Sequence, residues 1–316
     1  MKKERLATSR FCLTLGILIS LFIMSACRQI DLREDEGNGQ DYDDGCVEVK
    51  VRMGNFNISS SPISMSRAEG TEYPEGVTAI SIAAFNENNV RVDSVKAIKD
   101  INNETFNAPL LRLPPGNYTF VAVAHGASST DIEAATIESP ELVRLHETRI
   151  YETFSCVKSD VSVMGSAMTI NLAMGKRKNA QFALETLDVV PNEIVSVWIK
   201  INAEANTTVP LHPGFNPATG VATGNWLYSR NFSVQQGAVV YKTFGMLLPA
   251  ADYNMSVSIT PVGENKTEYT QLKKIFSDVT FSQNTLVRAV GYLFSTNTSF
   301  EFTFDTDWEP ENTLPF

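Results

Sequence analysis

The sequence predicts an all-β protein with two tandem β-sandwich domains, which follow a lipoprotein signal and an acidic tether. Three observations support this prediction. Residues 46–53 alternate Val47, Val49 and Val51 with charged residues, the period-two pattern of a strand with one buried face. A turn-and-strand motif occurs twice along the chain, as expected of two similar domains. The first residues have the basic-then-apolar order of an export signal that ends near a cysteine.

Residues 1–26 are predicted to be a lipoprotein signal peptide. Basic residues precede an uncharged run at 11–24, which is shorter than the roughly 20 residues that a membrane-spanning helix needs. The run ends in Met24-Ser25-Ala26-Cys27, where small residues suit a lipoprotein signal peptidase and the Cys27 thiol receives the lipid. The alternative is an ordinary cleaved signal with an incidental cysteine. We expect the mature chain to begin at Cys27 and to be held in outer-membrane lipid by its acyl chains.

Residues 27–45 are predicted to be a flexible acidic tether. Seven acidic residues lie between Asp31 and Asp44, mixed with glycine and asparagine, so the segment repels itself and stays solvated. It resembles the acidic export signals that place Bacteroidetes lipoproteins on the outer face of the outer membrane; a plain spacer is the alternative. The whole chain carries a net charge of −10, which makes nucleic acid a poor partner.

Two domains are predicted at residues 46–175 and 176–316, separated at a short basic turn. The motif Leu113-Pro114-Pro115-Gly116-Asn117-Tyr118 recurs as Leu248-Pro249-Ala250-Ala251-Asp252-Tyr253, an equal offset of 135 positions (248 − 113 and 253 − 118). Proline stops strand pairing, and the tyrosine opens the next strand. The Pro- and Gly-rich stretch 206–225 is predicted to be an exposed excursion, and the only helix candidate in the first domain is at 128–135. Strands are expected at 46–53, 77–85, 91–95, 118–124, 161–163, 168–173, 180–187, 194–202, 239–244, 253–259, 286–294 and 299–305.

Two cysteines remain in the mature chain after Cys27, namely Cys46 and Cys156. In an oxidising compartment they predict one disulfide, with two buried free thiols as the alternative. The three histidines stand in unrelated contexts, and no catalytic, phosphate-binding or metal-binding motif is present. The sequence therefore predicts no catalytic residue, no metal and no cofactor, and the protein is not expected to be an enzyme. A glycosidase pair of carboxylates stays open, because such a pair is defined in space.

A binding function is the alternative to a structural one. Tryptophans are common platforms for sugars, and Trp226 and Trp308 lie in segments where exposure is expected, whereas Trp198 sits inside a strand pattern and is predicted to be core. On this hypothesis the protein is a glycan-binding lipoprotein of an outer-membrane polysaccharide uptake system.

The assembled features resemble the fimbrillin superfamily of Bacteroidales. They are the lipidation motif, the acidic spacer, Cys46 at the first strand, the motif at 113–118, Cys156, and a second domain that opens Asn179-Ala180-Gln181-Phe182. The paired cysteines and retained lipid are most similar to the minor fimbrial proteins that anchor the shaft to the outer membrane. This resemblance implies transthyretin-like or Ig-like β-sandwich domains, other fimbrial subunits as partners, and a role in filament assembly and adhesion by strand exchange.

The resemblance also implies two candidate sites. In shaft subunits an arginine-specific protease removes the first strand, and Arg67 lies in a predicted loop that looks like such a site, although an anchor should keep its lipidated N-terminus. The alternative is an ordinary loop arginine. The best candidate donor strand is 299–305, where Phe300, Phe302 and Phe304 point one way. Its alternative is the final strand of the second domain's own sheet.

Overall fold

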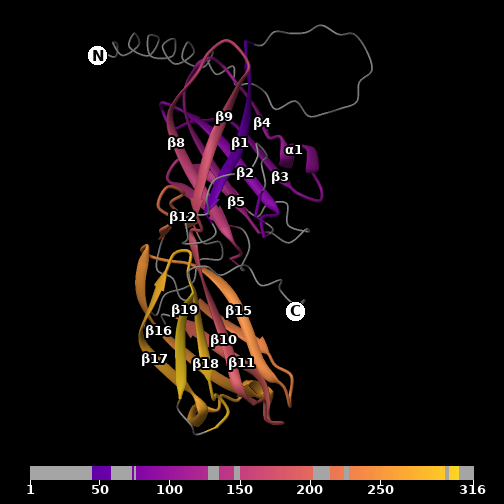
Figure 1. Ribbon diagram of the computed structural model, residues 1–316, viewed down its shortest axis with the longest axis vertical. Coiled ribbons are helices and arrows are strands. Elements are labelled where there is room, and N and C mark those ends of the chain that lie inside the picture. The colour runs from indigo at the N-terminus through magenta and orange to yellow at the C-terminus, as the bar shows by residue number, and fades with distance from the viewer. Residues whose placement is uncertain are drawn as a thin grey trace, which may run out of the picture.

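The computed structural model describes residues 45–57, 73–74, 76–126, 135–145, 150–201, 214–223, 228–295 and 299–305. These residues form two stacked β-sandwich halves, with the N-terminal half uppermost in Figure 1. The all-β fold predicted from the sequence is confirmed, since almost all of the described regular structure is strand. Cys27 and Arg67 lie outside the described residues.

The N-terminal half packs two sheets face to face. One has the strand order β4-β1-β9 and the other the order β3-β2-β5-β8. Alternate residues of β1, from Val47 to Met53, point into the core between these sheets, as the valine alternation predicted. The elements of this half are β1 (Val47–Asn57), β2 (Ala79–Asn86), β3 (Arg91–Ile98), α1 (Asn103–Asn107), β4 (Leu110–Leu113), β5 (Gly116–His125), β8 (Thr153–Val163) and β9 (Met168–Lys176).

The C-terminal half repeats this arrangement and adds one strand. Its sheets have the orders β15-β10-β18-β19 and β14-β11-β16-β17. The elements are β10 (Asn179–Val189), β11 (Ile194–Ile201), β14 (Tyr228–Ser233), β15 (Val239–Leu247), β16 (Asp252–Gly263), the 3-10 turns η1 (Glu264–Lys266) and η2 (Thr270–Leu272), β17 (Lys274–Ser282), β18 (Leu286–Gly291) and β19 (Phe300–Asp305).

Strand pairing shows that the two halves are copies of one topology. In each half the first strand pairs antiparallel with the strand before the repeated turn and parallel with a later strand: β1 with β4 and β9, β10 with β15 and β18. The repeated motif leads into equivalent strands, β5 and β16, each central in its sheet. The duplicate motif in the sequence therefore marks a duplicated fold. Only β18 has a further neighbour, β19; among the described residues nothing pairs with the corresponding edge of β9.

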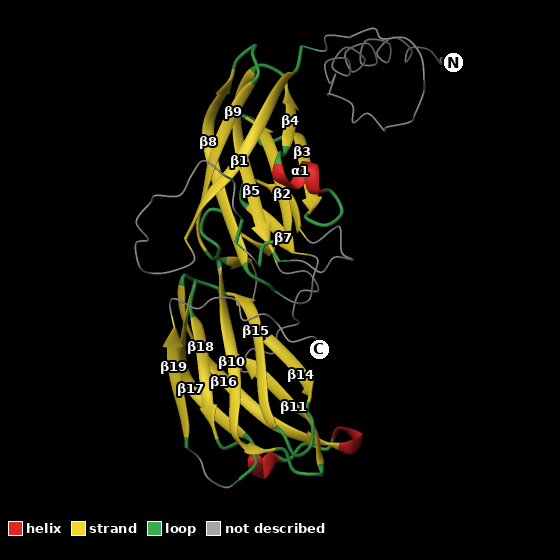
Figure 2. Cartoon of the chain, turned by 45° about the vertical axis from the view of Figure 1, so that its right-hand side comes forward, coloured by secondary structure: helices red, strands yellow, loops and turns green. Residues whose placement is uncertain are grey.

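A fifth sheet joins the two halves, with the strand order β13-β12-β7-β6. It consists of β6 (Ala135–Ser139), β7 (Leu142–Leu145), β12 (Gly214–Phe215) and β13 (Ala222–Thr223). Strands β6 and β7 come from the N-terminal half, and β12 and β13 come from the stretch predicted to be an exposed excursion. The label β12 therefore lies between the halves in Figure 1, and β7 lies at the lower end of the N-terminal half in Figure 2. The division into two domains at residue 176 stays a prediction, because this sheet and its core belong to both halves.

The prediction of an exposed excursion at 206–225 is wrong for its described part, residues 214–223. Gly214 pairs with Arg144 of β7, and the Phe215 side chain is fully buried in a core shared with Val143 and Leu145. Proline and glycine favour loops, and two-residue strands of this kind have no sequence signature that would reveal them. The helix predicted at 128–135 falls outside the described residues except for Ala135, which starts β6.

Candidate functional site: strand edges and the junction between the halves

The first candidate is β19, which contains the three phenylalanines of the predicted donor. It pairs antiparallel with β18, and Phe302 lies opposite Ala289. The Phe276 ring of β17 lies 5.2 Å from the Phe300 ring and 4.9 Å from the Phe302 ring, measured between centroids. The Phe304 side chain is 55% exposed. In this structure the segment is thus the final strand of its own sheet, the alternative that the sequence left open. Its role as a donor stays a prediction.

The second candidate is β1, the strand that follows the predicted tether. It is the central strand of its sheet, paired antiparallel with β4 from Val47 to Lys50 and parallel with β9 from Val49 to Asn57. The side chains of Val49 and Val51 are buried in the core. A strand with partners on both edges and a buried face is held along most of its length.

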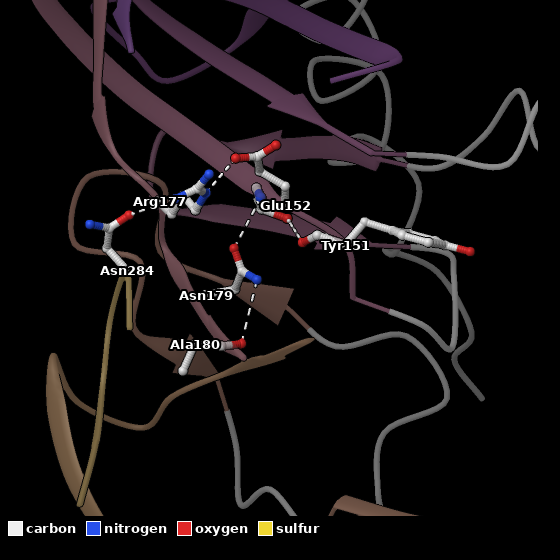
Figure 3. A network of polar contacts seen from close by, with 7 residues as sticks. Tyr151, Glu152, Arg177, Asn179, Ala180 and Asn284 are labelled. Carbon is white, nitrogen blue, oxygen red and sulfur yellow. Dashed lines mark hydrogen bonds and ion pairs between the residues drawn. The ribbon is translucent and has the colours of Figure 1, made fainter. Parts of the chain in front are cut away.

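The third candidate is a buried polar network at the junction of the halves, shown in Figure 3. Arg177 lies between β9 and β10 and is fully buried. Its Nε donates to the Glu152 carboxylate, and its Nη1 donates to the side-chain oxygen of Asn284 at 3.3 Å. The Asn179 side chain accepts a hydrogen bond from the backbone N–H of Thr153 at 3.0 Å. The network therefore ties segments of the N-terminal half to the first strand and a later turn of the C-terminal half.

Burial dominates the electrostatics of this network. It raises the pKa of the Glu152 carboxyl above its ordinary value, while the charge and hydrogen bond of Arg177 act in the opposite direction. Breaking such a pair leaves an uncompensated buried charge, which costs about 3 to 5 kcal/mol. No sequence signal distinguishes Arg177, which stands in a short basic turn of the type that is normally solvated.

Two further contacts fix the junction. The Ser155 hydroxyl of β8 donates to the Pro217 carbonyl at 2.6 Å, and the Lys178 ammonium donates to the Ala218 carbonyl at 3.1 Å. Ile150 and Gly245 form an isolated antiparallel bridge between the halves. With the shared sheet, these contacts connect the halves through backbone pairing as well as side chains.

The predicted disulfide between Cys46 and Cys156 is wrong in this structure, where Cys156 is a free thiol. The two residues belong to different sheets. Cys46 directly precedes β1, whose Val47 pairs with Leu113, whereas Cys156 pairs with Ala122 in the middle of β5. The strand rise of about 3.3 Å per residue puts Ala122 roughly 20 Å along β5 from the turn beside Leu113, well beyond the 7 Å limit for bridged Cα atoms. Burial raises the pKa of the Cys156 thiol to about 11.

The prediction that Trp198 is a core residue is also wrong. Val197 and Ile199 point into the core of the C-terminal half, so Trp198 between them points outward. Its indole Nε1 donates to the Ser229 hydroxyl at 2.8 Å, and the Lys200 ammonium lies 3.4 Å from the ring centroid. The lysine ammonium therefore covers one face of the indole ring. Trp226 and Trp308 lie outside the described residues.

Residues 43–312 match the family of fimbrillin-A associated anchor proteins Mfa1 and Mfa2. The chain belongs to this family. The match covers most of the sequence, including both sandwich halves and the sheet between them. The fimbrillin resemblance of the sequence is therefore confirmed. No curated protein matches the chain.

Two solved fimbrial proteins of Porphyromonas gingivalis are similar to the chain. The fimbrial anchor protein Mfa2 is 12% identical with a TM-score of 0.45, over 83% of this chain and 98% of that chain. The tip fimbrial protein Mfa3, in a C-terminally truncated form, is 10% identical with a TM-score of 0.42, over 83% of this chain and 100% of that chain.

The proteins of this family are fimbrial anchor proteins. No group of three or more His, Cys, Asp or Glu side chains in the described part is arranged to hold a metal ion. Within the same residues no helix is long and apolar enough to cross a membrane. The outer strands of the described sheets have one edge each without a described partner, and such an edge is a template for an added strand.

Proposed function

We propose that this protein anchors a fimbrium to the cell surface, or forms one of its minor subunits, and that it holds neighbouring subunits by β-strand exchange. Acyl chains on Cys27 join it to the outer membrane. Membership of the fimbrial anchor family supports the fimbrial role. The observation that carries the anchor role is the position of β1, the strand between the proposed tether and the rest of the fold.

An anchor must transmit a pull from the filament to the membrane. The pull from the tether reaches the fold at Val47, the first residue of β1. The chain leaves the N-terminal half at Lys176, the last residue of β9, and continues through Arg177 into β10. Because β1 and β9 are parallel over eight registered residue pairs, opposite pulls at these two points slide one strand along the other. The ladder hydrogen bonds then share the force and do not open one at a time.

The buried face of β1 adds to this resistance. Val49, Val51 and Met53 are 2% exposed or less, so sliding the strand exposes apolar surface at about 25 cal/mol per Å². On its other edge β1 is paired with β4. Extracting the strand next to the tether therefore breaks pairing on both of its edges and exposes its buried face.

Retention of β1 requires that the chain stay intact at Arg67, which follows β1 in the sequence. Cleavage there leaves the lipidated segment held to the fold by non-covalent contacts alone. We therefore propose that Arg67 is not cleaved in the working anchor. Mass spectrometry of the protein from its native cells reads the lipid and the cleavage in one measurement.

The experiment that tests the anchor role is Cys27→Ala in cells that display filaments. We expect the variant to leave the membrane fraction with an unchanged melting temperature and the filaments to be shed into the medium. The matched control is Gln29→Ala, which changes a residue close to Cys27, keeps the lipidated cysteine and should leave the filaments attached. Membrane attachment of the Cys27 variant, or attached filaments in its presence, would contradict the anchor role.

A further inference from the structure

Among the residues that the structure places, one edge of the N-terminal half lacks the strand that its counterpart carries. In the C-terminal half β19 lies along the outer edge of β18, as Figure 1 shows. The counterpart of β18 is β9, since each pairs parallel with the first strand of its half. Among the described residues nothing pairs with the outer edge of β9. The duplicated topology therefore has one occupied and one unoccupied position of the same kind.

The side chains beneath these two positions also correspond. Ala122 of β5 pairs with Cys156 of β8, and Val257 of β16, 135 positions after Ala122 (257 − 122), pairs with Phe276 of β17. Cys156 thus takes the place of Phe276, the residue that Phe300 and Phe302 of β19 cover. In the part of the chain that the structure describes, no strand covers Cys156 in this way.

The core at this edge is incompletely covered. Cys156, Val161 and Met168 are partly buried side chains that pack against the core of the N-terminal half. Two of them come from β8 and one from the start of β9, so they flank the unoccupied position. Large apolar side chains of an added strand would bury them further, as the phenylalanines of β19 do for Phe276.

The backbone of β9 is available for pairing. The Asn171 carbonyl accepts a hydrogen bond from the Lys158 ammonium of β8 at 3.1 Å, so this carbonyl points away from β1. The N–H and C=O groups of one strand residue point to the same side, and the side alternates along the strand. Thr169, Asn171 and Ala173 therefore direct their backbone groups to the outer edge. A lysine over such an edge is a common guard against uncontrolled pairing between copies.

Charge selects among candidate strands. Lys50 and Arg52 are exposed on β1 and lie opposite Thr169 and Asn171 of β9. A strand added to β9 would place its outward side chains in the same cross-strand rows. Acidic residues suit that position, and β19 itself has this character, with phenylalanine at alternate positions and outward acids.

We propose that the outer edge of β9 is an acceptor for a strand of another fimbrial subunit. The strand runs antiparallel to β9, directs large apolar side chains toward Cys156, Val161 and Met168, and directs acidic side chains outward. The proposal rests on the proposed function for the source of the strand. The partner is an alternating apolar and acidic strand with free backbone groups on one edge.

The probe is a labelled synthetic peptide with the sequence of residues 299–305, which has the required alternation. The protein is the mature chain with Cys27→Ala, and binding is followed by fluorescence anisotropy. We expect saturable binding that slows alkylation of Cys156 several-fold, because the bound strand covers the thiol. A peptide of the same composition with its phenylalanines placed consecutively should bind about tenfold more weakly or not at all.

The matched variants are Ala173→Pro and Ala173→Thr at an exposed position of β9. Proline removes an N–H on the outer edge and is tolerated where that N–H faces solvent, whereas threonine keeps it. We expect the proline variant to lose peptide binding and the threonine variant to retain it, with both melting as the parent does. Protection of Cys156 by the peptide tests the same point without any substitution at β9.

Three results would overturn the proposal. In one, the peptide binds while Cys156 reacts at its free rate, which places the peptide on another edge, such as that of β18 after displacement of β19. In the second, the protein dimerises through this edge without peptide, which makes the occupant a second copy. In the third, the peptide does not bind but the Cys27→Ala cells still shed their filaments. This result would contradict the acceptor edge and would still support the anchor role.

Discussion

The packing of β19 in its own sheet predicts a large effect of Phe302→Ala on the isolated protein. The Phe302 ring lies over Phe276 and packs against the core of the C-terminal half, but it is only partly buried. A fully buried phenylalanine costs about 3 to 5 kcal/mol when truncated to alanine, so a half-buried one should cost about 2 kcal/mol. At about 2 to 4 °C per kcal/mol for a chain of this size, the melting temperature should fall by roughly 4 to 8 °C.

The assay is thermal unfolding of the purified wild type and variant, followed by circular dichroism. Phe304→Ala is the matched control, because this side chain on the same strand is 55% exposed and its loss should change stability by no more than about 0.5 kcal/mol. Equal melting of Phe302→Ala and wild type would refute the reasoning and show that β19 is not held in its own sheet in solution. If filaments were also lost from cells with Phe302→Ala, the strand would be a donor to another subunit.

Three further outcomes are expected. Cys156 should react with iodoacetamide at pH 8 roughly a hundredfold more slowly than an ordinary thiol. The reason is that burial raises the pKa of Cys156 to about 11 and only the thiolate reacts. Alkylation at the rate of an ordinary thiol would contradict this expectation. Tyr118→Phe should cost about 1 kcal/mol in urea unfolding, since it removes a 2.7 Å hydrogen bond to a turn carbonyl, whereas the exposed Tyr253→Phe should be neutral. Gly245→Ala should destabilise the protein by about 1 to 3 kcal/mol and speed proteolysis at the junction, because the added Cβ would collide with a backbone carbonyl of the N-terminal half. The control is Gly54→Ala, whose added Cβ meets open space. Equal effects of the two substitutions would exclude that steric cause.

The sequence by itself determined the fold class and the duplication. Alternating valines indicate a strand with one solvent-exposed and one buried face, and β1 is such a strand. The repeated turn at 113–118 and 248–253 predicted two like units, and the strands that follow it have the same place in two equivalent sheets. Strands buried on both faces were also found from their apolar runs, as at 77–85 and 118–124. These features are visible because period and turn chemistry are local properties of the chain.

Several local patterns failed where distant segments decide the environment. Trp198 lies in a strand as predicted, but only the sheet sets which face is inward, and the side chain points out. Phe215 is in a Pro- and Gly-rich stretch yet is buried, because β7 from the other half supplies a strand partner. Arg177 stands in a basic turn yet is buried, because Glu152 and Asn284, from distant parts of the chain, accept its hydrogen bonds.

The candidate assembly sites divide in the same way. The phenylalanine alternation of 300–304 showed that this segment is a strand, since alternation is a property of the sequence alone. Which edge that strand covers depends on the order of strands in the sheet. The same order shows that no described residue pairs with the outer edge of β9, which is placed in its sheet by β1, more than a hundred positions earlier in the chain. The same is true of the cysteines: their number allowed a disulfide, but strand register set Cys46 and Cys156 too far apart, because a bridge needs both thiols at one point in space.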